Sequence, residues 1–322
     1  MKALVLNAVN QPFSFRSVAE DVAGPAHVAV SLMASALNHR DLFISQGLYA
    51  GIRLPVIPGS DGAGLLGERR VVIYPALEWG DSPDFQGKDF RVLGMPDNGT
   101  FAGRIVVPES SVFDMPAHLT WEQAAALPLA GLTAWRTLFS RCRLKSGERV
   151  LITGIGGGVA LMALQLATAA GATVFVTSGS NEKIEKALLL GAAGGECYRE
   201  DGWDKRLKQK YGGFDVVIDA AGGDGFALLP GMCNPGARIG FYGGTLGRVN
   251  GLALQPLFWK QISLLGSTMG SPKEFDDMLR FVATHRIIPV VDEVFDLEEG
   301  NSAMEKMKNG NQFGKLVLRN SN

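Results

Sequence analysis

The chain has very few cysteines. Among its 322 residues only Cys142, Cys197 and Cys233 are cysteines, and they are widely spaced with no CxxC pair. A disulfide framework needs more cysteines at closer intervals, so this count argues against one and is typical of a protein from a reducing compartment. We therefore expect a cytoplasmic protein.

An excess of one charge and a long apolar run are also missing. The 31 basic and 32 acidic residues give a net charge of −1, which provides no electrostatic basis for binding nucleic acid or an anionic membrane. No apolar run reaches the roughly 18 residues that a membrane helix needs. The apolar run of Met1–Leu6 is too short for a signal peptide and is typical of a strand. The GxSxG, HExxH and Walker patterns are absent too.

Glycine, by contrast, is abundant. The chain has 41 glycines, clustered between apolar runs, a placement that indicates strand-to-helix turns rather than disorder. The most informative cluster, Gly154–Gly158, follows the apolar run Arg149–Thr153 and precedes the helical pattern Val159–Ala170. Such a turn lets the backbone approach an anion, toward which the first N–H groups of the helix point.

The spacing within this turn matches a dinucleotide-binding fingerprint. Gly154, Gly157 and Ala160 occupy its three positions, and alanine is allowed at the last. A glycine turn that serves only close packing is the alternative, but a second strand at Thr173–Thr177 completes the strand–helix–strand unit that the fingerprint requires. We predict that a nicotinamide cofactor binds here, with Gly154, Gly157, Gly158 and Val159 among its contacts.

The end of this second strand indicates which nicotinamide cofactor binds. An NAD site usually carries an acid there to hold the adenosine ribose, whereas residues 177–183 read TSGSNEK. Ser178 and Ser180 can donate hydrogen bonds to a 2′-phosphate, and Lys183 can supply positive charge. The alternative, in which Ser180 or Asn181 caps the next helix and Lys183 is solvated, is compatible with phosphate binding. We therefore predict NADP(H) rather than NAD(H).

The order of the predicted elements indicates two domains of an α/β protein. Residues 1–122 are rich in strands, residues 123–266 alternate strands with helices, and residues 267–322 add helices at Pro272–His285 and Leu297–Lys308 and a last strand at Lys315–Arg319. The alternation predicts a doubly wound parallel sheet. The predicted strands are Ala26–Ala34, Arg70–Tyr74, Thr100–Val107, Arg149–Thr153, Thr173–Thr177, Cys197–Tyr198, Phe214–Asp219, Ala237–Tyr242 and Ile262–Leu265.

Several segments in this order resemble one family. They are Ala36–Leu42, Pro58–Gly64, Asp97–Ala102, Ala124–Ala134, the glycine turn and Gln312–Val317. Together they resemble the medium-chain dehydrogenase/reductase superfamily, and within it the zinc-free, quinone-oxidoreductase-like branch. The resemblance implies a GroES-like β-rich catalytic domain at 1–122, completed by 267–322, and a Rossmann NADP-binding domain at 123–266, with the active cleft between them.

The resemblance also implies that no catalytic metal is bound. Zinc alcohol dehydrogenases carry their ligands at positions that match Asn38, Ser60, Asp61 and Ala130 here. A catalytic zinc needs about three protein donors, and of these residues only Asp61 is an adequate one. Residues 76–99, where relatives carry the cysteines of a structural zinc, contain none. His39 is a further candidate metal ligand, but a single histidine beside a single carboxylate is more often packed or solvated than bound to a metal.

Zinc-free relatives reduce quinones, enones or other activated carbonyl compounds with hydride from NADPH, while hydrogen-bond donors stabilise the developing oxyanion. By resemblance, the candidate catalytic residues are Asn38, Tyr49 and Arg53, with His39 and Arg40 as further donors. The alternative for Asn38 is a purely structural role as the cap of a helix at 38–46. The alternative for Asp41 is an ion pair with Arg40 or Arg53. The remaining cofactor contacts implied by the resemblance are Thr133, Tyr242, Phe313, Gly314 and Lys315.

Two alternative functions stay open, and the chain is expected to have a partner. An alcohol dehydrogenase of this superfamily and a non-catalytic NADPH-binding protein are the alternatives to a reductase of a small-molecule substrate. The segment 257–266 carries an apolar strand without proline, which we expect to lie at a sheet edge and to pair with a second copy in a homodimer. An edge covered by the chain's own loop is the alternative. The hairpin at Gly64–Val71 is shorter than in relatives.

Overall fold

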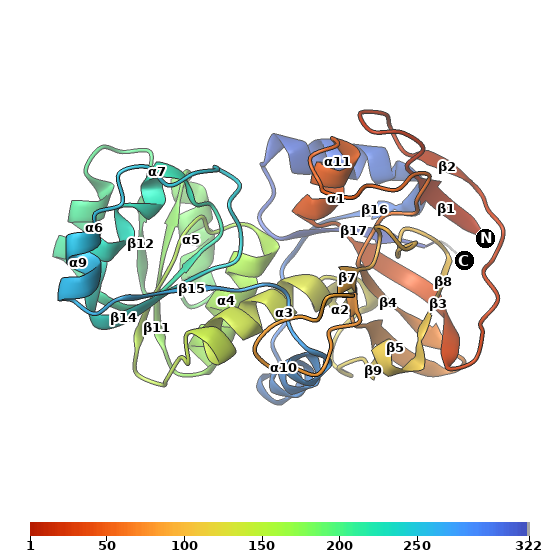
Figure 1. Cartoon of the computed structure of the whole chain (residues 1–322), viewed down its shortest axis with the longest axis horizontal. Coiled ribbons are helices and arrows are strands. Elements are labelled where there is room, and N and C mark those ends of the chain that lie inside the picture. Colours follow the sequence, from red (N-terminus) through yellow and green to blue (C-terminus); the bar gives the residue numbers. More distant parts are fainter. Residues whose placement is uncertain (321–322) are drawn as a thin grey trace. The chain divides into compact units, whose positions relative to one another are not determined.

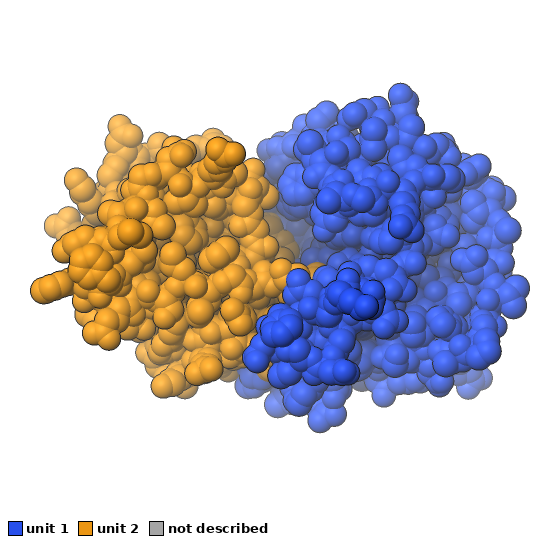
Figure 2. Space-filling view, viewed as in Figure 1, with its two compact units in different colours: residues 1–132, 270–322 blue, residues 133–269 orange. Residues whose placement is uncertain are grey.

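The computed structural model describes residues 1–320 and divides into two compact units. Residues 1–132 and 270–322 form the first, here the β-rich unit, and residues 133–269 form the second, the parallel-sheet unit (Figure 2). Both boundaries lie later than the predicted 122 and 266. The first lies later because the helix α2 (Trp121–Ala125), which begins at the capping box of Thr120 and Gln123, packs on strands of the β-rich unit.

The β-rich unit contains a seven-stranded sheet (Figure 1). Six of its strands run in the order β16-β17-β3-β4-β5-β9, and β8 pairs with the first half of β3. Their bounds are β3 His27–Ala36, β4 Asp61–Leu66, β5 Arg69–Ile73, β8 Arg104–Pro108, β9 Val112–Asp114, β16 Val291–Asp296 and β17 Lys315–Arg319. Two small hairpins, β1 (Lys2–Val5) with β2 (Ser14–Ser17) and β6 (Ala76–Leu77) with β7 (Arg91–Val92), complete the strands.

The same unit also contains helices. They are α1 (His39–Ser45), α2, α3 (Pro128–Trp135, which ends beyond the unit), α10 (Pro272–His285) and α11 (Gly300–Asn309), with single turns at Glu109–Ser111 and Leu297–Glu299. One core forms around Leu32, Val71 and Ile105. A second joins the N-terminal strand to the C-terminal segment through Leu4, Phe101, Leu316 and Met304.

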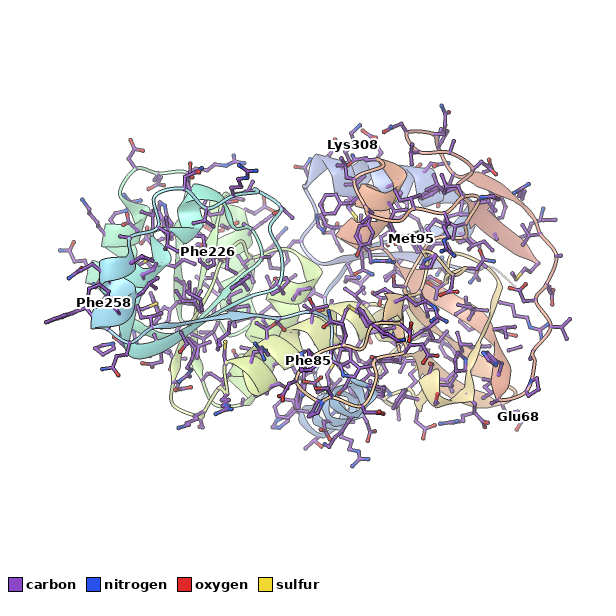
Figure 3. All side chains as sticks on the ribbon, in the orientation of Figure 1. Glu68, Phe85, Met95, Phe226, Phe258 and Lys308 are labelled. Carbon is purple, nitrogen blue, oxygen red and sulfur yellow. The ribbon has the colours of Figure 1, made fainter. Side chains whose placement is uncertain are left out.

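One predicted strand of this unit begins too early. The prediction placed its start at Thr100, whereas β8 begins at Arg104. Residues 99–101 bend instead, because their N–H groups donate to the carbonyl oxygens of residues 57–59. The hairpin between β4 and β5 is as short as the sequence indicated: Leu66 lies opposite Arg69, and only Gly67, at a φ of +61°, and Glu68 form the turn (Figure 3).

The parallel-sheet unit contains six parallel strands in the order β12-β11-β10-β13-β14-β15. Their bounds are β10 Arg149–Ile152, β11 Thr173–Ser178, β12 Gly194–Cys197, β13 Phe214–Asp219, β14 Cys233–Phe241 and β15 Ser263–Gly266. The direction of winding reverses beside β10, the first strand, which confirms the doubly wound sheet. In such sheets dinucleotides bind at the carboxyl end of the strands where the order reverses.

The helices of this unit follow its strands. They are α4 (Gly158–Ala169), α5 (Asn181–Leu189), α6 (Trp203–Tyr211), α7 (Gly223–Phe226), α8 (Leu229–Met232) and α9 (Leu254–Trp259), and a π-helical segment at Arg136–Arg141 precedes β10. The core of the sheet includes Leu151, Phe175, Phe214 and Ile239. The predicted strand at Cys197–Tyr198 is wrong in its position, because β12 starts at Gly194–Gly195, which lack the branched side chains that signal a strand.

The strand β15 lies at one end of this sheet, as the sequence predicted for an edge strand. The preceding helix α9 is strongly exposed: 67% of Phe258 and 75% of Trp259 are accessible to solvent, and Phe258 lies on its outer surface (Figure 3). Among residues 1–320 no helix is both long enough and apolar enough to cross a membrane.

Candidate active site

The glycine turn joins β10 to α4 in the parallel-sheet unit. Gly154 has a φ of +64° and Gly156 a φ of +130°, values that favour glycine. The turn is anchored to β11, since Ile155 N–H donates to the Thr177 carbonyl over 2.8 Å. A Cβ atom on Gly154 or Gly157 would meet no heavy atom within 4 Å, so the space beside the turn is open.

The first turn of α4 faces this open space with unpaired donors. The helix begins at Gly158, with Gly157 as N-cap, and the first four N–H groups of a helix, which include those of Gly158 and Val159, have no intrahelical acceptor. Together with the positive end of the helix dipole they form an anion site. The structure therefore places in one turn the four residues that the fingerprint predicted as cofactor contacts, namely Gly154, Gly157, Gly158 and Val159.

The two serines at the end of β11 have local partners. The Ser178 hydroxyl is buried, donates to the Ile155 carbonyl over 3.4 Å and accepts from the Ser180 N–H over 3.2 Å. Ser180 is the N-cap of α5, where its hydroxyl accepts from the Lys183 N–H. Ser178 thus fixes the glycine turn, and the capping role considered for Ser180 is confirmed.

Positive charge gathers at the same place. The Lys183 side chain lies along the glycine turn, with Cδ 3.0 Å and Nζ 3.5 Å from the point where a Cβ on Gly156 would stand. Arg199 Nε and the Tyr198 hydroxyl lie 2.9 and 3.0 Å from the corresponding point on Gly179, at the tip of β11. Arg199 and Tyr198 were not predicted as site residues. In the sequence, only their position just after β12 could have indicated a role in this site, and the predicted bounds of that strand were inaccurate.

Asp219, at the end of β13, organises the neighbouring loop. Its carboxylate accepts from Thr153 Oγ1 over 2.6 Å and from the N–H groups of Ala221 and Gly222. Tyr242, directly after β14, donates its N–H to the Asp219 carbonyl over 3.2 Å. Burial, and secondarily the charge of Asp219, raise the pKa of the Tyr242 phenol well above its usual range, so this hydroxyl stays protonated. Thr133 is buried.

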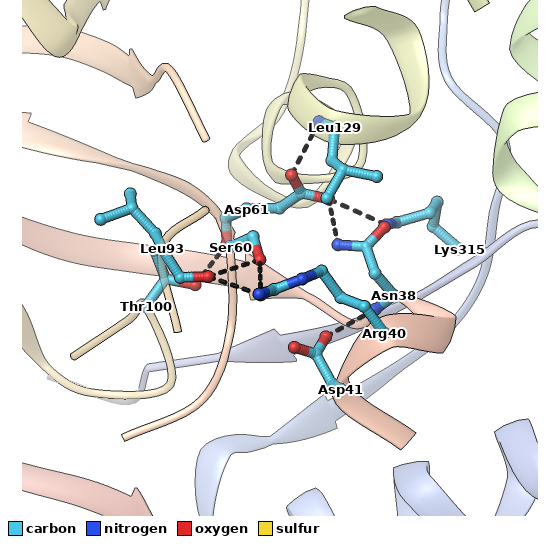
Figure 4. Close-up of polar contacts among 9 residues, drawn as sticks. All are labelled: Asn38, Arg40, Asp41, Ser60, Asp61, Leu93, Thr100, Leu129 and Lys315. Atoms are coloured by element: carbon cyan, nitrogen blue, oxygen red, sulfur yellow. Dashed lines mark hydrogen bonds and ion pairs between the residues drawn. The ribbon is translucent and has the colours of Figure 1, made fainter. Parts of the chain in front are cut away.

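The β-rich unit holds a buried polar cluster of Asn38, Asp61 and Lys315 (Figure 4). Lys315 Nζ donates to Asp61 Oδ2 over 2.9 Å and to Asn38 Oδ1 over 2.6 Å. Asn38 Nδ2 donates to the same Asp61 Oδ2 over 2.9 Å. The three residues come from different elements, because Asn38 is the N-cap of α1, Asp61 begins β4 and Lys315 begins β17. The Asn38 side chain therefore does more than cap a helix.

Asp61 is fully buried, with 0% of its surface accessible. Its second carboxylate oxygen, Oδ1, accepts from the Leu129 N–H over 2.8 Å, in the first turn of α3. A buried charge is costly unless it is paired and hydrogen-bonded. Here both oxygens have donors and an ammonium group balances the charge, so the carboxylate is stable without solvent.

The segment before β17 positions Lys315. Gly314 has a φ of +132°, and a Cβ there would lie 2.7 Å from the Val290 carbonyl oxygen. Phe313 N–H donates to Asp292 Oδ1 over 2.9 Å. Only glycine allows this close approach, so the backbone directs Lys315 into the cluster. The sequence predicted Phe313, Gly314 and Lys315 as cofactor contacts and did not anticipate the ion pair with Asp61.

Arg40 and Asp41 do not form the pair that was considered. The Arg40 guanidinium donates to Ser60 Oγ over 2.8 Å and to the Leu93 carbonyl over 2.6 Å. Asp41 Oδ2 accepts the Asn38 N–H over 2.8 Å, whereas Oδ1 is buried without a hydrogen-bond partner in the described chain. Burial raises the pKa of Asp41 to about 6. The pairing with Arg40 or Arg53 was wrong because Arg40 is held by Ser60 and Leu93.

The other two predicted catalytic residues lie at the surface. Tyr49 is 39% exposed, and the Arg40 guanidinium stands 5.3 Å from its ring centroid. Arg53 is exposed as well. Within residues 1–320 neither side chain hydrogen-bonds to Asn38, Asp61 or Lys315. The structure thus brings Lys315 to Asn38 and leaves Tyr49 and Arg53 outside the cluster.

A β-rich unit joined to a doubly wound sheet with a glycine turn defines a two-domain, nucleotide-dependent dehydrogenase. The family model "Alcohol dehydrogenase GroES-like domain" matches residues 24–117, and the model "Zinc-binding dehydrogenase" matches residues 158–284. The "Zinc-type alcohol dehydrogenase-like protein YogA" of Leptosphaeria maculans is 35% identical over 343 residues, which cover 96% of this chain and 95% of that protein.

Solved structures agree with these matches. One described as "NAD-dependent alcohol dehydrogenase" superposes with a TM-score of 0.94 at 32% identity and covers 99% of both chains. The quinone oxidoreductase from Thermus thermophilus, also determined in complex with NADPH, gives a TM-score of 0.84 at 26% identity and covers 99% of this chain and 100% of its own. The chain belongs to the medium-chain dehydrogenase/reductase superfamily, whose members bind nicotinamide cofactors, and is an oxidoreductase.

Proposed function

We propose that the protein is an NADPH-dependent oxidoreductase that transfers hydride to a quinone, enone or other activated carbonyl compound without a catalytic metal. The observation that carries this proposal is the ion pair of Lys315 with Asp61. Asp61 is the one adequate ligand among the positions that match those of zinc relatives, and its Oδ2 holds an ammonium group and an amide N–H.

The residues at these positions do not fit a catalytic zinc. Ser60 Oγ donates to the Leu93 carbonyl over 2.8 Å and accepts from Arg40, Ala130 has no donor atom, and the Asn38 amide is hydrogen-bonded to Asp61 and Lys315. A catalytic zinc needs about three protein ligands with an open position. Among residues 1–320 no three His, Cys, Asp or Glu side chains are placed to share a metal ion.

The cofactor preference rests on the tip of β11. The glycine turn and the first turn of α4 offer a seat for a pyrophosphate. The side chains of Lys183, Tyr198 and Arg199 lie close to the glycines of the glycine turn and of the tip of β11, where residues 177–181 include no acidic residue. Arginine and lysine bind phosphate through charge-assisted hydrogen bonds, so this arrangement favours NADPH over NADH.

The glycine turn and the first turn of α4 would hold a reduced nicotinamide cofactor, which would supply a hydride, with both electrons of its C–H bond, for a new C–H bond at an electrophilic carbon of the substrate. The electron pair displaced at that carbon ends on the substrate oxygen, which then takes a proton from solvent. Asn38 is the residue that we assign to hold this oxygen. Its amide is fixed by Asp61 and Lys315 before substrate binds, which is the preorganisation that lowers the barrier to charge development.

Turnover tests the proposal. Purified protein should oxidise NADPH with benzoquinone, naphthoquinone or cyclohexenone, and exhaustive chelation should leave the rate unchanged. Elemental analysis should find much less than one zinc per chain. No oxidation of NADPH with any acceptor, despite tight NADPH binding, would instead favour a non-catalytic binding protein.

A second candidate is an alcohol dehydrogenase, which the structural similarity to a protein of that description favours. It predicts reduction of NAD⁺ or NADP⁺ with primary or secondary alcohols. A kcat/KM for such alcohols that exceeds the value for quinones and enones, and that chelation abolishes, would replace the first candidate by this one.

A further inference from the structure

We propose that Lys315 and Asn38 form a two-donor site for one substrate oxygen, in which the Lys315 ammonium provides the fixed positive charge. This inference rests on the proposed function, which supplies the hydride and the carbonyl substrate. It assigns to a lysine, delivered by the last strand of the β-rich unit, the electrostatic work that a metal ion performs in zinc enzymes.

Lys315 and Asn38 each have one N–H donor to spare. An ammonium group has three N–H bonds and an amide has two. Lys315 uses two of its three, on Asp61 Oδ2 and Asn38 Oδ1, and Asn38 Nδ2 uses one of its two, on Asp61 Oδ2. Within the described chain the remaining N–H of each group has no acceptor. Only 5% of Lys315 and 8% of Asn38 is exposed, and a buried donor without an acceptor is costly unless a ligand satisfies it.

The two spare donors belong to one small region. Nζ of Lys315 and Nδ2 of Asn38 each lie 2.9 Å from the same atom, Oδ2 of Asp61. Lys315 and Asn38 also contact each other directly over 2.6 Å. One oxygen atom of a ligand can therefore accept from both groups, in the manner of a two-donor oxyanion site.

Lys315 also fixes which end of the amide the site presents. An ammonium group only donates, so the atom of Asn38 that faces it must be the carbonyl oxygen. The amide consequently presents N–H rather than C=O to a ligand. A carbonyl or quinone oxygen, which accepts hydrogen bonds and gains negative charge as hydride arrives, matches this site. A group that only donates has no partner in it.

Asp61 acts as a positioning residue that holds the cation without using up its third N–H. Its second oxygen is bonded to Leu129 N–H at the start of α3, so part of its charge is directed toward the helix rather than toward Lys315. In the assigned step the electron pair from the C=O or conjugated system ends on the substrate oxygen beside Lys315. A proton from solvent then completes the reduction.

The test compares Lys315→Met with a matched surface variant, Lys308→Met, in full-length protein. Loss of a donor to a developing oxyanion lowers kcat by about 10²–10³-fold, and we expect that loss for Lys315→Met with the Kd for NADPH unchanged. Lys308→Met should keep the wild-type kcat. Because Lys315→Met leaves a buried carboxylate unpaired, the double variant Lys315→Met with Asp61→Asn is the partner measurement. It should fold, keep the NADPH affinity and show the same low kcat.

A spectroscopic measurement makes the test independent of turnover. With NADP⁺ bound, para-nitrophenol should bind as its coloured anion at pH values below those needed for ionisation in water, and Lys315→Met should abolish this shift. Loss of NADPH affinity with kcat within threefold of wild type would overturn the donor site and leave the proposed function standing. If wild type turns over none of the acceptors, the proposed function fails, and the nitrophenolate shift alone decides the donor site. Absence of the nitrophenolate shift in wild type would overturn the donor site.

Discussion

The Lys315 ammonium donates to Oδ1 of Asn38 over 2.6 Å, although 277 positions separate the two residues. The register of β17 against β3 produces this contact. Val317 lies opposite Ala36, and Leu37 N–H donates to the Leu316 carbonyl over 2.9 Å, so the first residue of β17 reaches the N-cap of α1. A slip of one residue would turn Lys315 to the other face of the sheet, so strand pairing determines the chemistry of this cluster.

A carboxylate at the N-cap of α5 should reverse the cofactor preference. Asp caps a helix as well as Ser does, so Ser180→Asp should keep α5 intact while it places negative charge at the tip of β11. We expect the Kd for NADPH to rise by about 10-fold or more relative to that for NADH, from charge repulsion. Ser180→Asn, an uncharged cap, is the control. Equal changes for both cofactors in a fluorescence titration would contradict the assigned phosphate site.

The guanidinium of Arg199 should contribute to the same preference. A hydrogen bond to a charged group contributes about 1.5–3 kcal/mol, which corresponds to about 10–150-fold in Kd. Arg199→Ala should therefore raise the Kd for NADPH by that factor and leave the Kd for NADH nearly unchanged. Lys205→Ala, which removes an exposed positive charge from α6, controls for a general change in charge. If both variants behave alike, Arg199 does not contact the cofactor.

A branched side chain at the N-cap of α4 should block cofactor binding without unfolding the protein. A Cβ on Gly157 meets no heavy atom within 4 Å, and its φ of −80° suits any residue. Gly157→Val should leave the melting temperature unchanged and raise the Kd for NADPH by on the order of 100-fold, or about 2.7 kcal/mol. Gly157→Ala should have a smaller effect. A folded Gly157→Val variant with wild-type affinity would leave the turn with only a packing role.

The buried carboxyl of Asp41 should make stability depend on pH. Its pKa is raised from 3.8 to about 6, chiefly by burial, so the folded state binds this proton more tightly than the unfolded state. Stability from this group is present below pH 3.8 and is lost as pH rises toward 6, a difference of about 3 kcal/mol. Relative to wild type, Asp41→Asn should gain up to that amount between acidic and neutral pH in urea unfolding. Asp201→Asn, at an exposed acid, should show no such trend.

The edge of the parallel sheet should form a dimer. We propose that β15 pairs with its copy in a second chain, because an apolar edge strand is otherwise a liability and because exposed Phe258 and Trp259 lie next to it. Light scattering at micromolar concentration should give twice the chain mass of 34.4 kDa. Leu264→Lys should reduce it to the monomer, whereas Leu189→Lys, on the exposed surface of α5, should not. A monomeric wild type would contradict the pairing.

The sequence predicted elements whose signals are local. The bounds of α10 match the prediction because Ser271, Pro272 and Glu274 form a capping box with a helix-starting proline. The strand β16 was missed, since Asp292 and Glu293 interrupt its apolar pattern and form ion pairs with Lys306 of α11, which is distant in the sequence. In the site, the glycine fingerprint was readable because it is contiguous. The ion pair of Lys315 with Asp61 could not be predicted from the sequence, because it depends on the pairing of strands that lie far apart in the sequence.

The discontinuity of the β-rich unit also sets an order of assembly. Residues 1–132 and 270–322 form one unit, and Lys315 is synthesised 254 positions after Asp61. Until then Asp61 lacks its cation, and a carboxylate without a partner resists burial. The parallel-sheet unit, made from one continuous stretch of chain, can therefore fold before Lys315 is synthesised, while the cluster around Asp61 closes only after Lys315 has emerged. A nascent chain stalled before residue 315 would carry a folded parallel-sheet unit and an incomplete cluster of Asn38 and Asp61 without Lys315.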